Sequence, residues 1–279
     1  MHKTALVFIF GLMAAICLSL PAAAQTPPAT QSGSMGQAAA GPMPTNNIGQ
    51  LFFSTPKPGS AQQFEQGRKR HMDWHRRQND AWTWYTFETL TGEHTGDYMT
   101  GTFGHNWKDF DGRDKFEAAD TADVALNLGP YMASSMSAFY AFRPDLTMPT
   151  PGAAPNPPPS PYANIIHYYL KPEGVPEFTQ GIHKINDAIK KTNYGAGLSS
   201  PEWYQLVSGG TGPEFVLVFP RKSYAEMQGP DKPLLTMLEE VYGKDDATAT
   251  FNMITKNTRF VRSEFIKYRP ELSYIPATR

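Results

Sequence analysis

Two short runs of the chain are rich in aromatic and β-branched residues and stop at Pro and Gly. They are IGQLFFSTPKPG, from Ile48, and YANIIHYYLKPEG, from Tyr162. This composition predicts strands that are buried on both faces. After each run, residues 60–79 and 175–192 carry apolar residues at helical spacing, and two further strands follow, joined by the Gly-rich turns TGEHTGD and SGGTGPE. A longer helical segment, 113–142 or 230–268, is expected to close each set.

The same order of elements occurs twice, and the two copies align residue by residue. KPGSAQQFEQGRKRHMDWHRR, from Lys57, aligns without a gap with KPEGVPEFTQGIHKINDAIKK, from Lys171. Further along, WYTFET matches WYQLVS, and FYAFRPDLTMP matches FIKYRPELSYIP. Three matches in one order indicate an internal duplication.

Each copy reads β, α, β, β, α, and its RPDL or RPEL tail can supply one more strand, as in a ferredoxin-like unit. The arrangement resembles the dimeric α+β barrel superfamily, which includes antibiotic-biosynthesis monooxygenases, EthD-like proteins and haem-binding chlorite dismutases. The resemblance spans about residues 49–276. It implies an α+β fold in which two tandem ferredoxin-like repeats, 49–149 and 162–279, form a single-chain dimeric α+β barrel. Because the fused repeats supply both sheets, we expect a monomer.

The segments outside the repeats have distinct compositions. Residues 1–24 have the basic start, apolar run and A-x-A ending of a secretory signal peptide, which predicts a periplasmic or secreted protein. Residues 25–48 predict a disordered leader, and residues 150–161 a Pro-rich linker. The only cysteine, Cys17, lies in the signal, so no disulfide is expected. A formal net charge of −1 without a basic stripe argues against nucleic acid as a partner, and no further apolar run suggests a membrane span.

The two copies differ in polarity on the helix that follows the first strand. The second copy has an apolar stripe there: Phe178, Ile182, Ile185 and Ile189. The aligned residues of the first copy are Phe64, Arg68, His71 and His75. On the strands, Glu88, Thr100 and Thr102 stand where the second copy has Val207, Leu217 and Phe219. Buried polar groups destabilise a core unless they are paired or hydrated, so the first copy is expected to contain a polar-lined pocket.

His71 and His75 are one helical turn apart and can face the same point. Three interpretations remain open: a satisfied network with Glu88 in a non-catalytic envelope or binding protein, a site for an apolar or aromatic small molecule, or a metal or haem site. In the second, the protein is a cofactor-independent oxygenase or related oxidoreductase, with His71 or His75 as base and Arg68 holding an anionic oxygen. A metal would take Glu88 or His105 as third ligand, whereas haem would take an axial histidine.

The candidate catalytic residues are therefore His71, His75, Arg68 and Glu88. The candidate ligand-binding residues are Trp84, Thr100, Thr102, His105 and Trp107. No cofactor is expected if the pocket binds only an organic ligand, and a divalent metal or haem is the alternative.

Overall fold

The computed structural model describes residues 47–148 and 159–277. The predicted signal peptide, nearly all of the predicted leader and most of the predicted linker lie outside these ranges, although strand β1 already includes Ile48, the last residue of the predicted leader. None of the helices in the described ranges has the length and hydropathy needed to span a bilayer.

The first half of the chain contains four strands and three helices: β1 (Ile48–Pro56), α1 (Ala61–Arg77), β2 (Tyr85–Thr89), β3 (Tyr98–His105), α2 (Trp107–Phe110), α3 (Asp114–Asn127) and β4 (Met132–Phe142). The second half follows a similar order: β5 (Tyr162–Leu170), α4 (Val175–Thr192), β6 (Glu202–Ser208), β7 (Glu214–Arg221), α5 (Leu234–Tyr242), α6 (Lys244–Thr255) and β8 (Thr258–Tyr268). Short 3-10 turns lie at Gly129–Tyr131, Pro172–Gly174, Tyr224–Gln228 and Pro270–Leu272.

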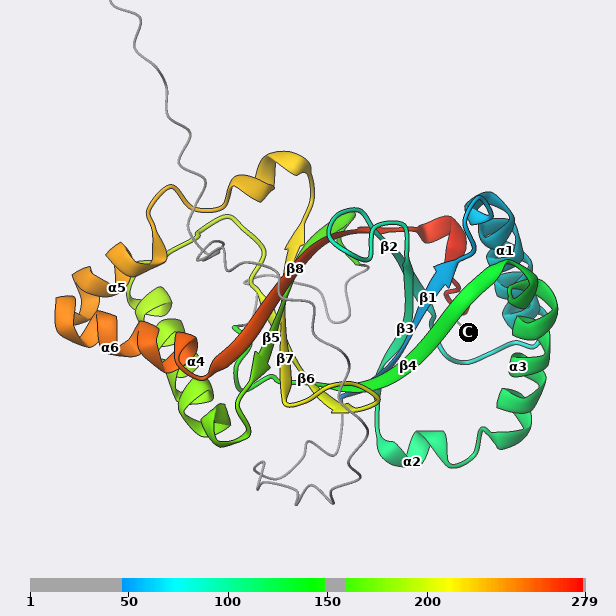
Figure 1. Ribbon diagram of the computed structural model, residues 1–279, viewed down its shortest axis with the longest axis horizontal. Coiled ribbons are helices and arrows are strands. Elements are labelled where there is room, and N and C mark those ends of the chain that lie inside the picture. The colour runs from blue at the N-terminus through cyan, green and yellow to red at the C-terminus, as the bar shows by residue number, and fades with distance from the viewer. Residues whose placement is uncertain (1–46, 149–158, 278–279) are drawn as a thin grey trace, which may run out of the picture.

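The strands form one closed barrel in the order β1-β3-β2-β8-β5-β7-β6-β4. All neighbouring strands in it are antiparallel. The halves meet at two short seams, where β2 pairs with β8 and β4 pairs with β6. The helices of the first half lie on one side of the barrel and those of the second half on the opposite side (Figure 1). The prediction of a mixed α+β fold with an antiparallel sheet is confirmed.

The expectation of a long helix closing each half was wrong in its C-terminal part. Residues Met132–Phe142 and Thr258–Tyr268 are the strands β4 and β8. Burial alternates with a period of two near their ends, at Ala138 and Tyr140 and at Glu264 and Ile266. Each strand pairs along its length with the first strand of its half, and this pairing supplies the backbone hydrogen bonds that the sheet requires.

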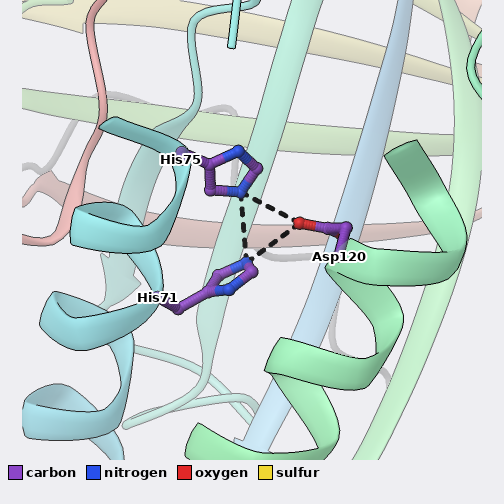
Figure 2. Close-up of side chains that lie close together, drawn as sticks. All are labelled: His71, His75 and Asp120. Atoms are coloured by element: carbon purple, nitrogen blue, oxygen red, sulfur yellow. Dashed lines mark hydrogen bonds and ion pairs between the residues drawn. The ribbon is translucent and has the colours of Figure 1, made fainter. Parts of the chain in front are cut away.

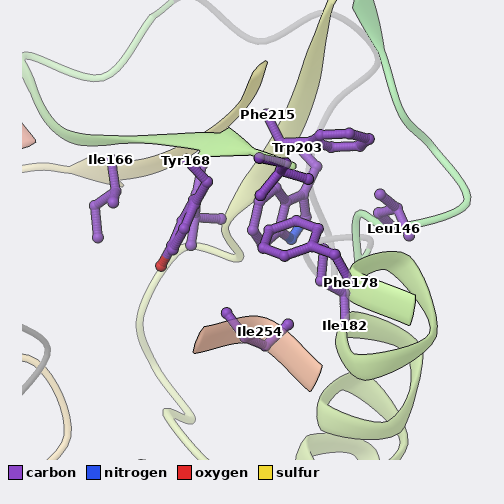
Figure 3. Packing of buried hydrophobic residues seen from close by; sticks show 10 residues of the cluster. Leu146, Ile166, Tyr168, Phe178, Ile182, Trp203, Phe215 and Ile254 are labelled. Atoms are coloured by element: carbon purple, nitrogen blue, oxygen red, sulfur yellow. The ribbon is translucent and has the colours of Figure 1, made fainter. Parts of the chain in front are cut away.

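Apolar residues fill both the barrel and the space under α4. Inside the barrel, buried side chains from both halves form one cluster: Leu51, Ala138, Tyr140, Ala163, Ile165, Val216 and Ile266. Under α4, a second cluster joins Phe178 and Ile182 to Trp203, Phe215 and their neighbours (Figure 3). In this half the helix therefore packs as its apolar stripe predicts.

In each half, a glycine allows a second helix to pack closely on the first: α3 on α1, and α6 on α4. A Cβ added at Gly67 of α1 would lie 2.1 Å from the carbonyl oxygen of Asn127, at the end of α3. A Cβ at Gly181, the aligned residue of α4, would lie 2.9 Å from side-chain atoms of Met253 and Ile254 in α6. The first of these contacts fixes how closely α3 approaches α1, which is where the candidate site lies.

Candidate metal centre

One face of α1 is buried although it is polar. Arg68, His71 and His75 are 9%, 2% and 1% exposed, and they continue the face that begins with Phe64. Phe64 packs on Tyr98 of the sheet, with ring centroids 5.0 Å apart. The two histidines instead contact residues of α3 and of the loop after α1. The α1 face is thus shared between the sheet and a second helix.

Helix α3 lies against α1 in the opposite direction. Its C-terminal end meets Gly67, its middle meets His71, and Arg113, just before its first residue, bonds Asp80 beyond the end of α1. No residue of α3 is buried, in contrast to α5 and α6, which bury residues such as Met237 and Leu238. The aligned residues Ile185 and Ile189 of α4 pack on that apolar cluster. The histidines therefore occupy a helix–helix contact that is apolar in the second half.

Three ligand atoms converge between the helices (Figure 2). The Nε2 atoms of His71 and His75 are 3.2 Å apart. Oδ1 of Asp120 lies 3.4 Å from the first and 3.1 Å from the second. This oxygen is buried and has no hydrogen-bond partner among the described residues. Each histidine therefore turns the same ring nitrogen toward one carboxylate oxygen.

A second layer of carboxylates orients both imidazoles. Nδ1 of His71 lies 2.8 Å from Asp123, and Nδ1 of His75 lies 2.9 Å from Asp80. Asp80 is itself held by Trp84 Nε1 at 2.8 Å, by the guanidinium of Arg113 and by the backbone N–H of Trp82. These hydrogen bonds, led by the one to His75, hold the pKa of Asp80 well below its usual value in spite of burial. Asp80 is therefore ionised and accepts a hydrogen bond from His75.

The hydrogen bonds determine which ring nitrogens carry protons. An ionised carboxylate only accepts hydrogen bonds, so Nδ1 of each histidine is the donor. Burial, followed by the positive charge of Arg68, lowers the pKa of His71 to about 3, so this ring is neutral at pH 7. Its Nε2 then presents a lone pair to the other two atoms. A positive charge among the three atoms would offset the repulsion between their lone pairs.

The structure separates several residues that the sequence grouped together. Glu88 lies apart from the histidines and binds Arg269 at 2.5 Å. His105 stacks on Trp82 at 3.9 Å and contacts the hydroxyl of Thr102 at 2.6 Å, so neither predicted third ligand is the one observed. We expected Glu88 or His105 beside the two histidines, but the carboxylate that lies there is that of Asp120.

The remaining predicted residues lie at varying distances from this centre. Trp84 belongs to it through Asp80, and its ring is 5.5 Å from that of His75. Thr100 is buried and bonds Thr86 at 3.1 Å within the sheet. Trp107 is 37% exposed and packs on Phe110 and Phe139. The predicted pocket for an organic ligand stays a prediction.

Sequence reasoning missed the acidic residues Asp80, Asp120 and Asp123. Two features could have pointed to them. Helix α3 has no apolar stripe, and Asp120 and Asp123 are three residues apart, so both side chains lie on one face of the helix. An acidic face on a segment that follows a buried histidine pair is a pattern worth testing for a metal site.

Comparison with known proteins reveals similarity of structure only. The sequence matches no protein-family model, and no curated protein sequence matches it. An anthrone oxidase-like protein aligns with a TM-score of 0.50 and 12% identity, covering 81% of this chain and 92% of that one. A putative monooxygenase from Lactobacillus acidophilus NCFM (TM-score 0.48, 7% identity) covers 83% of this chain and 97% of that one. A chlorite dismutase variant from Candidatus Nitrospira defluvii (TM-score 0.49, 10% identity) covers 81% and 92%. The chain has the dimeric α+β barrel fold that the resemblance implied.

Proposed function

We propose that the protein binds one divalent transition-metal ion through His71, His75 and Asp120, and uses it in oxidoreductase chemistry on a small molecule. The observation that carries this proposal is the convergence of three acceptor atoms on one point. Two Nε2 atoms and a buried carboxylate oxygen approach one another to 3.1–3.4 Å, and Asp120 Oδ1 has no donor among the described residues. Lone pairs repel one another at this distance unless a metal ion or a proton lies between them.

The spacing of the three atoms suits a metal ion. Ligands ~2.0–2.1 Å from a tetrahedral ion lie ~3.3–3.4 Å from each other. The distances in this centre are 3.2, 3.4 and 3.1 Å. Small side-chain movements would therefore be enough to close the centre around an ion.

The second layer of carboxylates supports the same assignment. Histidine ligands of metals usually donate their other ring N–H to a carboxylate or carbonyl, which fixes the tautomer and increases the basicity of the ligating nitrogen. Asp123 and Asp80 occupy these positions for His71 and His75. A purely structural network would not require both imidazoles to be oriented in this way.

Two histidines and one carboxylate leave coordination positions open. This donor set is the one that non-haem Fe(II) oxygenases use, and an open position is a feature of catalytic rather than structural metal sites. The fold is also that of a protein described as anthrone oxidase-like. Both points favour a redox reaction on a small molecule over a structural metal.

The other interpretations of the histidines have less support. A cofactor-independent oxygenase needs a base whose pKa lies near the working pH, whereas the pKa of His71 is lowered to about 3. The other candidate base, His75, turns Nε2 toward His71 and Asp120, at 3.2 and 3.1 Å, rather than toward a substrate. Haem needs room for a macrocycle beside its axial ligand, but Asp120 Oδ1 lies 3.1 Å from His75 Nε2 and 3.4 Å from His71 Nε2. A single small ion fits the same space.

Export of the protein, the internal duplication and a monomeric state remain parts of the proposal.

Metal analysis of the purified protein tests the proposal. We expect one equivalent of bound metal after loading with Fe(II), Zn(II) or Co(II), and a visible d–d spectrum for the cobalt form. Replacing His71 and His75 by alanine should abolish the bound metal and the cobalt spectrum. Replacing His183, an exposed histidine on α4, by alanine should change neither the metal content nor the spectrum. Wild-type protein that binds no metal, or a double variant that binds it equally well, would refute the proposal.

A further inference from the structure

Arg68 is a buried cation that forms no salt bridge with any of the described residues. Its side chain is one helical turn before His71 on α1, and the residue is 9% exposed. Its Nε is buried without a hydrogen-bond partner, and none of the residues that the structure describes forms a salt bridge with its guanidinium. A buried donor without a partner is unfavourable, so Nε of Arg68 is free to donate a hydrogen bond to an anion from outside the chain.

Arg68 lies close enough to the three-atom centre for its charge to be felt there. Burial lowers its pKa to about 10, the negative charge of Asp120 partly offsets this effect, and the side chain remains cationic at pH 7. A guanidinium beside a metal centre would repel the metal, unless an anionic ligand is bound between them.

Asp120 of α3 is the most exposed of the three residues at the centre. The side chain of Asp120 is 24% exposed, whereas those of His71 and His75 are almost fully buried. On the sheet, Phe52 packs with residues under α1, and the strand residue paired with it, Ser137 of β4, is exposed. The helix-facing side of the sheet is thus exposed to solvent at Ser137.

We propose that Arg68 binds the carboxylate group of the substrate, so that the substrate of this centre is a small carboxylic acid. The inference rests on the proposed function. One carboxylate oxygen would replace a water molecule at the open position of the metal, and the other would accept hydrogen bonds from the guanidinium. Arginine suits this role because its planar fork matches a carboxylate, and because it is more easily desolvated than lysine. No covalent bond of the protein is made or broken in this step.

The test uses the cobalt-loaded protein, with acetate as the probe and acetamide as its neutral counterpart. At constant ionic strength, acetate should change the visible cobalt spectrum in a saturable way, and acetamide should not. Arg68→Gln should weaken acetate binding roughly tenfold or more, as expected for the loss of charge-assisted hydrogen bonds. Arg77→Gln, which removes the same charge from an exposed position of α1, should leave acetate affinity unchanged.

The possible failures can be told apart. If the wild-type protein binds no cobalt, the proposed function fails, and this inference fails with it. If Arg68→Gln binds cobalt and also binds acetate as tightly as the wild type, only the role of Arg68 is overturned. Should Arg68→Gln not fold, as judged by circular dichroism, Arg68→Lys replaces it. Lysine keeps the charge without the fork and should weaken acetate binding several-fold, and unchanged affinity would overturn the proposal.

Discussion

Asp120→Asn should separate metal binding from stability, because the change affects the two in opposite directions. The carboxylate oxygen that faces both histidines has no donor among the described residues. An amide at the same position can turn its NH₂ group toward an Nε2 lone pair and form a hydrogen bond worth ~0.5–1.5 kcal/mol. The loss of the attraction between Asp120 and Arg68 reduces this gain. The metal-free variant should therefore be as stable as the wild type, or more stable by up to ~1.5 kcal/mol.

In the presence of metal the order should be reversed. A metal at 100 times its Kd stabilises the wild type by ~2.7 kcal/mol, which is ~5–11 °C in Tm for a protein of this size. Removing a direct ligand should cost at least the ~100-fold in affinity that loss of a supporting residue can cause. At the same metal concentration the variant would then gain only ~0.4 kcal/mol, or ~1–2 °C.

Differential scanning calorimetry with and without Zn(II) measures both effects. Glu117→Gln is the matched control, because it makes the same change of charge on an exposed face of α3, three residues before Asp120. It should behave like the wild type in both conditions. If Asp120→Asn destabilises the metal-free protein by more than ~1 kcal/mol and keeps the full metal-dependent rise, then Asp120 is a structural residue rather than a ligand.

Three further predictions concern the histidines and the contact between α1 and α3. The double change His71→Ile and His75→Ile should abolish metal binding. In urea unfolding without metal, the free energy of unfolding should stay level or rise by up to ~1–2 kcal/mol, since Asp80 and Asp123 keep other donors. A loss of ~3 kcal/mol would instead reveal a structural network. The pKa of His71 is about 3 in the folded protein against an ordinary 6.5, so the unfolded chain binds a proton on this ring first as the pH falls. Without metal, the free energy of unfolding should therefore decrease from about pH 6.5 down to pH 3, by up to ~1.4 kcal/mol per pH unit. An equal slope in the double variant would show that His71 is not the cause. Gly67→Ala, whose Cβ would lie 2.1 Å from the Asn127 carbonyl oxygen, should cost ~1–3 kcal/mol and weaken metal binding by moving α3 away, whereas Gly112→Ala, where the added Cβ meets nothing within 4 Å, should do neither.

Much of the fold could be predicted because its apolar pattern is strong and occurs twice. The runs that became β1 and β5, and the helices α1 and α4, follow from local periodicity alone. The strands β4 and β8 could not be separated from the helices before them in this way. Each lies at a seam between the halves, and its pairing partners come from distant parts of the sequence.

The candidate site was predicted only in part, for a related physical reason. Comparing the two copies pointed to His71 and His75, because the polar residues stand where the second copy has isoleucine. Asp120 had no such reference, because the segments that follow the third strand differ in length and composition between the halves. Its place opposite the histidines depends on how α3 crosses α1, which is a long-range contact that no local pattern specifies.

The lack of buried residues in α3 has a consequence for how the protein behaves without its ion. Helices hold their place mainly by burying an apolar face, and no residue of α3 is fully buried. Its attachment to α1 rests on the partly buried Phe116 and Val124, on Asp120 and Asp123, and on the close contact at Gly67. Such a segment opens locally at a small fraction of the free energy of global unfolding. An ion shared by both helices would suppress this opening, so amide hydrogen exchange and proteolysis along α3 should report whether the centre is filled.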